Sequence, residues 1–530
     1  MLTDTHLDRT PNPSGFFLHN AEPDDILLPT HRPLRPLLDK LFVIDQEWEA
    51  WSYIGLPAVI LVLLILINSF KNLVKSKKFV FSTKYLPQSN LKITLWASLV
   101  LLIFAFGFPF KSFPALLDWF PDVKNFRATG RFAWFFYFAI TIACIVVVDN
   151  ISKILKENNR NITAIILIIA VPLIFIIEGW SYHKEVSYYV SQNPNLLSDE
   201  LPEGGYKELI DKINTKDYQA ILPLPYYYIG SENFTRPVNN NSVQNSMVLS
   251  CHTSLPICGS YLTRTGISES KKIVQIVSPD YYDKPIKYDL NSDKPFLVLQ
   301  SNAALTLYEE NLLRKASFVY GNETAKLYSI LPDVLFSSSA GEEIENFKIK
   351  KEQLFSRKGF LVEDTTAFLY FKGFENEQSE FVFAGKGALS GNKNETTLIA
   401  EFPAGTFKAG KTYMASAWMF NGQLDALNFW LRFIVEEYDE VNNSWEITYT
   451  ITEQSETING NWSLVELAFK VNDPTHYTCL KLTGKEIDKV KFYMDDLLVK
   501  EKDADVYKVL ETQNASITEL FKNNQRIRVF

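Results

Sequence analysis

The sequence predicts a membrane α-helical region with four transmembrane helices, followed by an extracytoplasmic α/β domain and a C-terminal all-β sandwich. Three observations predict this fold class. Apolar residues between positions 51 and 178 are concentrated in four long runs, the pattern after residue 181 is mixed, and after about residue 342 apolar and polar residues alternate. The predicted domains are 1–50, 51–180, 181–335 and 342–507, with a C-terminal tail at 508–530.

The four hydrophobic runs have the length of membrane-spanning helices. Each is close to the roughly 20 apolar residues needed to cross about 30 Å of hydrocarbon, and the polar stripe of a helix that covers a soluble core is almost absent. Aromatic residues such as Trp119 and Trp180 lie near several ends, as in an interfacial belt. The predicted spans are Trp51–Phe70, Ile93–Phe110, Phe132–Val148 and Ile162–Ile177.

Basic residues predict the orientation of these spans. Six lysines and no acidic residue lie between the first two runs, and Lys153, Lys156 and Arg160 follow the third. Because basic loops stay in the cytoplasm, both connections are predicted to be cytoplasmic, with residues 1–50, the loop 111–131 and the chain after Trp180 outside. The acidic outer segment 1–50 shows no signal peptide, so we expect that it was a loop within a longer protein whose upstream portion is missing.

The segment 181–335 alternates strand-like and helix-like stretches, which predicts a small α/β domain. Strands are predicted at 219–224, 295–300 and 325–330, and helices at 205–213 and 303–315. The long excursion 225–290 is of a length that is usually functional. It contains Cys251 and Cys258, which could form a disulfide outside the cytoplasm or remain two free thiols.

The segment 342–507 consists of short runs with a period of two, separated by Gly, Asn and Asp turns, which predicts a two-sheet sandwich. In the tail, a short helix is predicted near Ile517–Asn523. The strand-like runs are 381–383, 396–402, 412–420, 429–436, 445–451, 463–471 and 489–499.

Composition excludes several classes of function. The net charge of −8 and the lack of a basic cluster argue against a nucleic-acid partner. The sequence contains no glycine-rich phosphate loop, nucleophile elbow, zinc-spaced Cys/His cluster or kinase signature.

Two groups of polar residues on the predicted outer side are candidates for substrate binding. Arg127 and Arg131 lie four apart where a loop becomes a hydrophobic helix, which favours binding of a lipid phosphate; the alternative is that both contact ordinary phospholipid head groups. His31 and Asp25 are candidates for acid/base work, with simple solvation as the alternative. In the sandwich, Trp418 and Trp430 would stack on sugar rings if exposed, or belong to the core.

Residues 20–180 resemble a known membrane family. The stretches Asp24–Pro33, Glu49–Pro57 and Phe126–Phe132 together look like the later helices and outer loops of bacterial polytopic proteins of the C-type glycosyltransferase (GT-C) superfamily. Members of that family use polyprenyl-phosphate-linked sugars, and the family's acidic catalytic residue lies in a first outer loop that this chain does not contain. The resemblance therefore implies ancestry and position in the membrane, but assigns no catalytic residue here.

Residues 370–500 resemble jelly-roll carbohydrate-binding modules. The similarity rests on Gly373-Phe374-Glu375, on Tyr493–Val499, and on Trp418 and Trp462 between them. In such modules an early Glu and a late Asp often hold a structural calcium, which the resemblance assigns to Glu375 and Asp496. The alternative is that the pair Asp495-Asp496 only begins a last strand.

Together, these features predict an integral protein of the bacterial inner membrane with its large C-terminal region in the periplasm. The leading hypothesis is a GT-C-related protein that acts on or binds lipid-linked sugars or surface glycans, with a partner subunit carrying upstream helices. The alternative is a non-catalytic, membrane-tethered carbohydrate-binding or scaffolding protein. Sequence upstream of Met1 would discriminate between these hypotheses.

Overall fold

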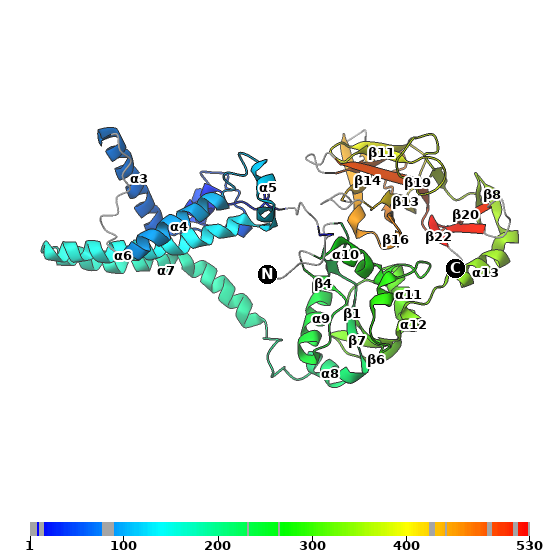
Figure 1. Ribbon diagram of the computed structural model, residues 1–530, viewed down its shortest axis with the longest axis horizontal. Helices are drawn as coiled ribbons and strands as arrows, with labels where there is room; N and C mark the ends of the chain where they lie inside the picture. The colour runs from blue at the N-terminus through cyan, green and yellow to red at the C-terminus, as the bar shows by residue number, and fades with distance from the viewer. Residues whose placement is uncertain are drawn as a thin grey trace. The chain divides into compact units, whose positions relative to one another are not determined.

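The computed structural model describes residues 8–9, 15–76, 89–230, 233–262, 265–422, 430–439, 443–484, 490–511 and 518–527. Lys77, Lys78 and Lys84 of the predicted cytoplasmic loop lie outside the described residues, as do the first residues of the runs 429–436 and 489–499. The chain forms two compact units, one of residues 12–194 and one that combines residues 1–11 with 195–530 (Figure 1).

The unit 12–194 is helical. Two helices are long and apolar enough to cross a membrane by length and composition, namely Thr129–Glu157 and Asn161–Gln192. The first comprises a short 3-10 turn, η3 (Thr129–Phe132), and α6 (Ala133–Glu157), and the second is α7 (Asn161–Gln192). The shorter apolar helices are α3 (Leu56–Ser76) and α4 (Ser89–Ala105). Only 6% of the apolar window of α7 is buried within the protein, so most of its hydrophobic surface is uncovered.

The second unit contains the predicted α/β region, built on a four-stranded sheet with the order β1-β5-β7-β6. The strands β1 (Ala220–Leu224), at one edge, and β5 (Phe296–Ser301) form a buried parallel pair, and the antiparallel strands are β7 (Ala325–Ile330) and β6 (Ser317–Gly321). The predicted helices are present as α8 (Gly205–Asp211) and α11 (Leu307–Lys315). At the start of α11, the Glu309 carboxylate accepts from Thr306 N (2.8 Å) and from Tyr226 N (2.6 Å).

The excursion 225–290 folds around two helices, α9 (Asn240–Thr253) and α10 (Ile267–Val274). Cys251 and Cys258 are both free thiols, so the disulfide considered for them is not formed in this structure. The N-terminal Asp8 caps α10, because its Oδ2 accepts from Ser268 N (2.6 Å) and its carbonyl oxygen accepts from Ile267 N (3.2 Å).

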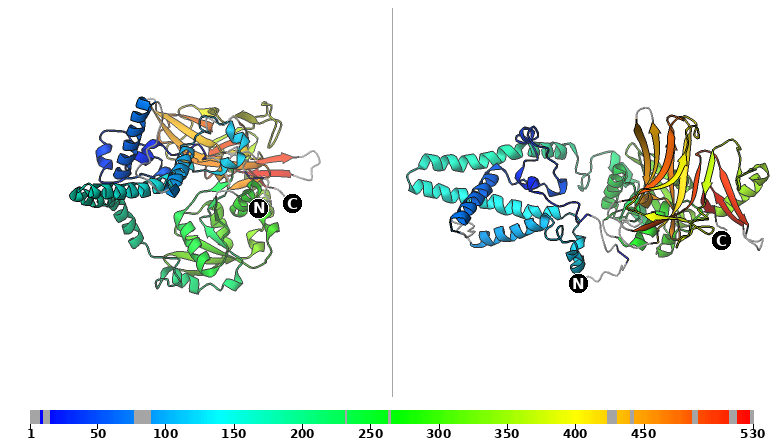
Figure 2. Two further views of the ribbon diagram at one scale, coloured as in Figure 1. Left: turned by 60° about the vertical axis from the view of Figure 1, so that its left-hand side comes forward. Right: turned by 90° about the horizontal axis from the view of Figure 1, so that it is seen from above.

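The C-terminal region is all-β, with two sheets whose inner faces share one core (Figure 2). The larger sheet has the order β10-β19-β13-β17-β16, with β11 also on β19, and the smaller has the order β12-β18-β14-β15. The larger sheet is formed by β10 (Leu369–Lys372), β11 (Leu389–Asn392), β13 (Thr412–Phe420), β16 (Thr457–Asn459), β17 (Trp462–Lys470) and β19 (Lys491–Glu501). The smaller sheet is formed by β12 (Thr397–Phe402), β14 (Arg432–Asp439), β15 (Ser444–Ile451) and β18 (Tyr477–Thr483).

Two secondary-structure predictions in this region are wrong. Residues 381–383 are not a strand; the side chains of Phe381 and Phe383 instead pack on aromatic rings of the larger sheet. The predicted helix near Ile517–Asn523 is a strand, β21 (Thr518–Lys522), which pairs with β20 (Val506–Glu511) and β22 (Gln525–Ile527). Pairing with these neighbours overrides the weak helical preference of so short a segment.

The tail is therefore part of the fold. Strands β20, β21 and β22 continue a five-stranded sheet with β9 (Phe360–Val362) and β8 (Phe355–Arg357). The hydrophobic core of the α/β sheet is also continuous with that of the sandwich. Residues 1–11 and 195–530 form one compact unit. The division of this part of the chain into 181–335, 342–507 and 508–530 stays a prediction.

Candidate functional site

The outer face of the sheet β12-β18-β14-β15 has a row of exposed aromatic and apolar side chains. In β15, Trp445, Ile447 and Tyr449 alternate along one face of the strand, with exposed fractions of 47%, 56% and 50%. Neighbouring β14 places Tyr438 opposite Trp445 and Glu436 opposite Ile447. A stretch of β-sheet that exposes two large aromatic rings side by side with aliphatic surface is typical of a binding site.

Charged side chains hold these rings in place. The Trp445 and Tyr438 ring centroids are 4.5 Å apart, and the Lys481 ammonium lies 5.0 Å from the Trp445 centroid. Lys481 also donates to Glu436 Oε2 at 2.5 Å. The Arg432 guanidinium lies 5.1 Å from the centroid of Tyr449. Apolar ring faces can stack on a sugar ring. The ammonium and carboxylate groups beside them can hydrogen-bond the sugar hydroxyls.

Trp418 does not belong to this face. It is fully buried, its ring stacks on Phe383 at 4.1 Å, and its indole N–H donates to the carbonyl oxygen of Asn524 at 2.9 Å. Of the two roles considered for Trp418, it has the core role, and the expectation that it stacks on sugars is corrected. Trp430 is half-buried beside the face, with the Arg432 guanidinium 5.7 Å from its ring centroid.

Sequence reasoning missed Trp445 and Tyr449. Their alternation in 444–451 predicted the strand, but alternation does not tell which face is covered by a second sheet. The available signal was that 445–451 carries Trp445 and Tyr449 on one face, a pattern that a core strand also shows.

The Glu375 and Asp496 pair does not fit a structural calcium. Asp496 is buried, and the ammonium of Lys508 lies 3.7 Å from its Oδ1, so a lysine already supplies a positive charge there. Burial raises the pKa of Asp496 to about 6. Glu375 is exposed and accepts from Lys386 N at 2.7 Å. Calcium takes about 6–8 oxygen ligands, and among the described residues no group of three or more His, Cys, Asp or Glu side chains is placed to hold a metal.

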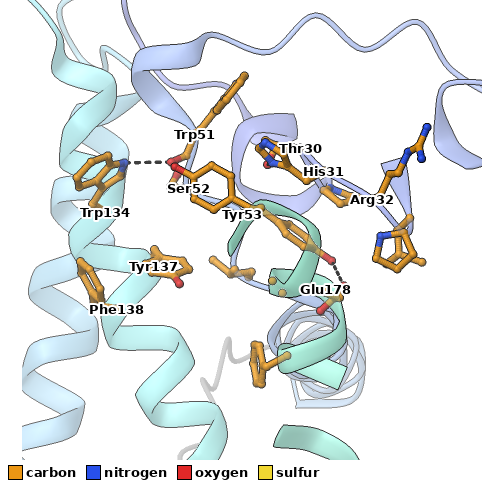
Figure 3. A pocket seen from close by; sticks show the side chains of 18 residues that line it. Thr30, His31, Arg32, Trp51, Ser52, Tyr53, Trp134, Tyr137, Phe138 and Glu178 are labelled. Carbon is orange, nitrogen blue, oxygen red and sulfur yellow. Dashed lines mark hydrogen bonds between the residues drawn. The ribbon is translucent and has the colours of Figure 1, made fainter. Parts of the chain in front are cut away.

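The helical unit contains a second candidate site, a cavity of about 380 Å³ (Figure 3). His31 lines it, with its ring centroid 4.6 Å from that of Tyr182 and 5.6 Å from that of Trp51. The Glu178 carboxylate accepts from the Tyr53 hydroxyl (2.7 Å) and from Leu56 N at the start of α3 (3.0 Å). The other aromatic residues of the lining are Trp134, Tyr137, Phe138 and Phe175.

The other predicted substrate-binding residues do not line this cavity. Arg127 precedes η3 and Arg131 lies within it, so the two do not project from one face of a regular helix as predicted. Arg131 Nε donates to Glu49 Oε2 at 2.5 Å. Asp25 is fully buried at the start of α1 (Pro23–Leu27), where its Oδ2 accepts from Glu22 N at 2.7 Å and burial raises its pKa to about 6.

Comparison with known proteins gives partial similarities. Residues 8–175 match the family model described as Domain of unknown function (DUF6311). No curated protein matches the chain in sequence. The CBM22-1 xylan-binding domain from Paenibacillus barcinonensis Xyn10C has 12% sequence identity and a TM-score of 0.17, with 28% of this chain and 87% of that chain covered. The C-terminal family 22 carbohydrate binding module of Clostridium thermocellum Xyn10B has 13% sequence identity and a TM-score of 0.17, and the match covers 28% of this chain and 88% of that chain.

Proposed function

We propose that this protein is a non-catalytic, membrane-anchored protein of the bacterial cell envelope that binds glycans through the outer face of the sheet β12-β18-β14-β15. The observation that carries the proposal is the pair of half-exposed rings, Trp445 and Tyr449, on the same face of the sheet as the ion pair between Lys481 and Glu436. Water leaves the ring faces when a sugar stacks on them, and the charged groups hydrogen-bond its hydroxyls.

The membrane anchor is the unit 12–194. Its two long apolar helices support this proposal, as does the exposed apolar surface of α7, because so much uncovered hydrophobic surface is unfavourable in water. We extend the proposal to four spans by including α3 and α4. The lysine-rich connection between them is then cytoplasmic, and residues 195–530 lie in the periplasm.

Substitution of the two exposed rings tests glycan binding. The full chain, purified in detergent, is mixed with insoluble and soluble envelope polysaccharides, and binding is measured by co-sedimentation and by tryptophan fluorescence. Trp445→Ala and Tyr449→Ala should each weaken binding about tenfold or more, as for central aromatic residues of other interfaces. Phe318→Ala is the matched control, because Phe318 is an exposed aromatic residue (63%) paired with Tyr328 on a different sheet. Equal binding by all variants would refute the proposal.

A second candidate function, binding of a polyprenyl-phosphate-linked sugar by a GT-C-related membrane region, is favoured by the aromatic cavity around His31. A partner subunit with further helices would then complete the site. If this function holds, His31→Ala and Tyr182→Ala should weaken binding of a short-chain polyprenyl-phosphate sugar, and the double variant Arg127→Ala/Arg131→Ala should weaken binding of the lipid phosphate alone. Unchanged lipid binding in all three variants would leave only the glycan-binding function.

A further inference from the structure

A cavity of about 430 Å³ lies between α10 and the turn that joins β16 to β17. It is within the size range of small-molecule sites in proteins. Its lining combines polar side chains with a larger share of apolar surface and comes from both the α/β region and the sandwich. The polar and charged residues used below are Lys271, Lys272 and Gln275 on or beside α10, Asp283, Asn459 at the end of β16, and Asn461 in the turn that follows.

The position of Lys271 is unusual for a cation. Its Nζ donates to Asn421 Oδ1 (3.1 Å) and Asn461 Oδ1 (3.3 Å), which are both neutral amide oxygens. Nζ also lies 5.9 Å from the ring centroid of Phe234. Among the described residues, no carboxylate lies within 4 Å of this ammonium, and burial lowers the pKa of Lys271 to about 8. A partly buried cation without an anionic partner is unfavourable unless a bound anion neutralises it.

The other charges around the cavity are already neutralised. Lys272 Nζ lies 2.7 Å from Asp289 Oδ2, and Asp283 Oδ1 lies 2.5 Å from Lys287 Nζ. Of the charged side chains that line the cavity, Lys271 is the one without an opposite charge among the described residues. The cavity therefore carries a local excess of one positive charge.

We propose that this cavity binds one sugar residue that carries a carboxylate, a hexuronate of an acidic glycan, with Lys271 as the partner of the carboxylate. An ammonium and a carboxylate form a charge-assisted hydrogen bond, which is stronger than the amide bonds that Lys271 makes now. The side-chain amides of Asn459 and Asn461 can both donate to and accept from sugar hydroxyls. This inference rests on the proposed function in one respect, namely that the ligand is a glycan. The site itself is distinct from the outer face that contains Trp445.

Calorimetric titration of the full chain in detergent tests the inference. Glucuronate and galacturonate should bind, whereas glucose and galactose should bind at least about tenfold more weakly because they lack the charge. Lys271→Gln should reduce uronate affinity about tenfold or more, Lys271→Arg should retain most of it, and the neighbouring variant Lys272→Gln should leave it unchanged. Uronate affinity of the unmodified protein should also fall as pH rises through about 8, because Lys271 loses its charge.

Several results would overturn the inference: no uronate binding, equal binding by Lys271→Gln in a protein that melts normally, or equal binding of neutral sugars. Acetate binding as strong as uronate binding would show a general carboxylate site and refute the sugar assignment. The Trp445→Ala variant separates this inference from the proposed function. That variant should lose polysaccharide binding and keep uronate binding. If the unmodified protein binds uronate but no polysaccharide, the proposed function alone is contradicted, and polysaccharide binding without uronate binding contradicts this inference alone.

Discussion

The indole N–H of Trp418 donates a 2.9 Å hydrogen bond to the backbone oxygen of Asn524, which lies 106 residues later in the chain. The Asn524 side chain donates in turn to the carbonyl oxygen of Asp496 at 2.6 Å. The most deeply buried tryptophan of the sandwich is thus completed by residues of the C-terminal hairpin.

This relationship predicts the result of truncation. A fragment of residues 342–507 should fail to show a cooperative thermal transition, because it lacks β21, β22 and the Asn524 carbonyl oxygen that accepts from Trp418. Residues 195–530 should melt cooperatively. Within the full chain, Asn524→Ala should lower the free energy of unfolding by about 1–3 kcal/mol, since it leaves the Asp496 oxygen without its buried donor. Circular dichroism melting checks all three proteins. A cooperative fragment 342–507 would contradict the role given to the tail.

A second prediction concerns the pH dependence of stability at Glu466, which accepts from the Tyr308 hydroxyl (3.3 Å) between the sandwich and the α/β region. Burial raises the pKa of Glu466 from 4.5 to about 7, and the negative charge of Glu456 acts in the same direction. The folded state therefore binds more protons than the unfolded state in this interval, so the contribution of Glu466 to stability should fall as pH rises from about 4.5 to about 7.

Glu466→Gln should remove this contribution to the pH dependence while it keeps an acceptor for Tyr308. Urea unfolding followed across this pH range is the measurement, and the exposed Glu342→Gln serves as the control. Parallel pH profiles for the unmodified protein and Glu466→Gln would show that Glu466 is not the responsible group.

The third prediction concerns the buried pair of Asp496 and Lys508. Lys508→Met should lower stability by up to about 3 kcal/mol, because it leaves the Asp496 carboxylate buried without a positive neighbour. Asp496→Asn in the same protein should restore part of the loss. Added calcium should leave the melting temperature of the unmodified protein unchanged, since Lys508 supplies the positive charge. A rise with calcium that Asp496→Asn abolishes would instead restore the metal-site hypothesis.

The fourth prediction tests membrane orientation. Cys251 is exposed in the unit that contains residues 195–530, so it should react with a membrane-impermeant maleimide in intact spheroplasts. In a Cys251→Ser background, a cysteine introduced at position 76, at the end of α3, should react only after the membrane is permeabilised. The reverse pattern would place the large unit in the cytoplasm and refute the envelope function.

Sequence patterns predicted the long elements well and the surfaces poorly. The strand at 412–420 was predicted from its strand-like alternation with the bounds it has in the structure, where both of its faces are buried. The same alternation in 445–451 could not show that its apolar face is uncovered. The cavity around His31 is assembled from segments near residues 30, 53, 136 and 178, so only His31 itself could be singled out before the segments were brought together.

Asp8 and Ser268 are in contact although they are 260 residues apart in the sequence. The dependence of this unit on such long-range contacts has a consequence for biosynthesis. The unit that contains residues 195–530 also needs β8 to pair through β9 with strands that are made near the end of translation. At roughly 5–20 residues per second, the early strands must wait many seconds for their partners. Unpaired strand edges and apolar side chains are exposed during that interval, and such chains aggregate readily. Production of this unit should therefore depend on chaperones that shield the chain until β22 has emerged.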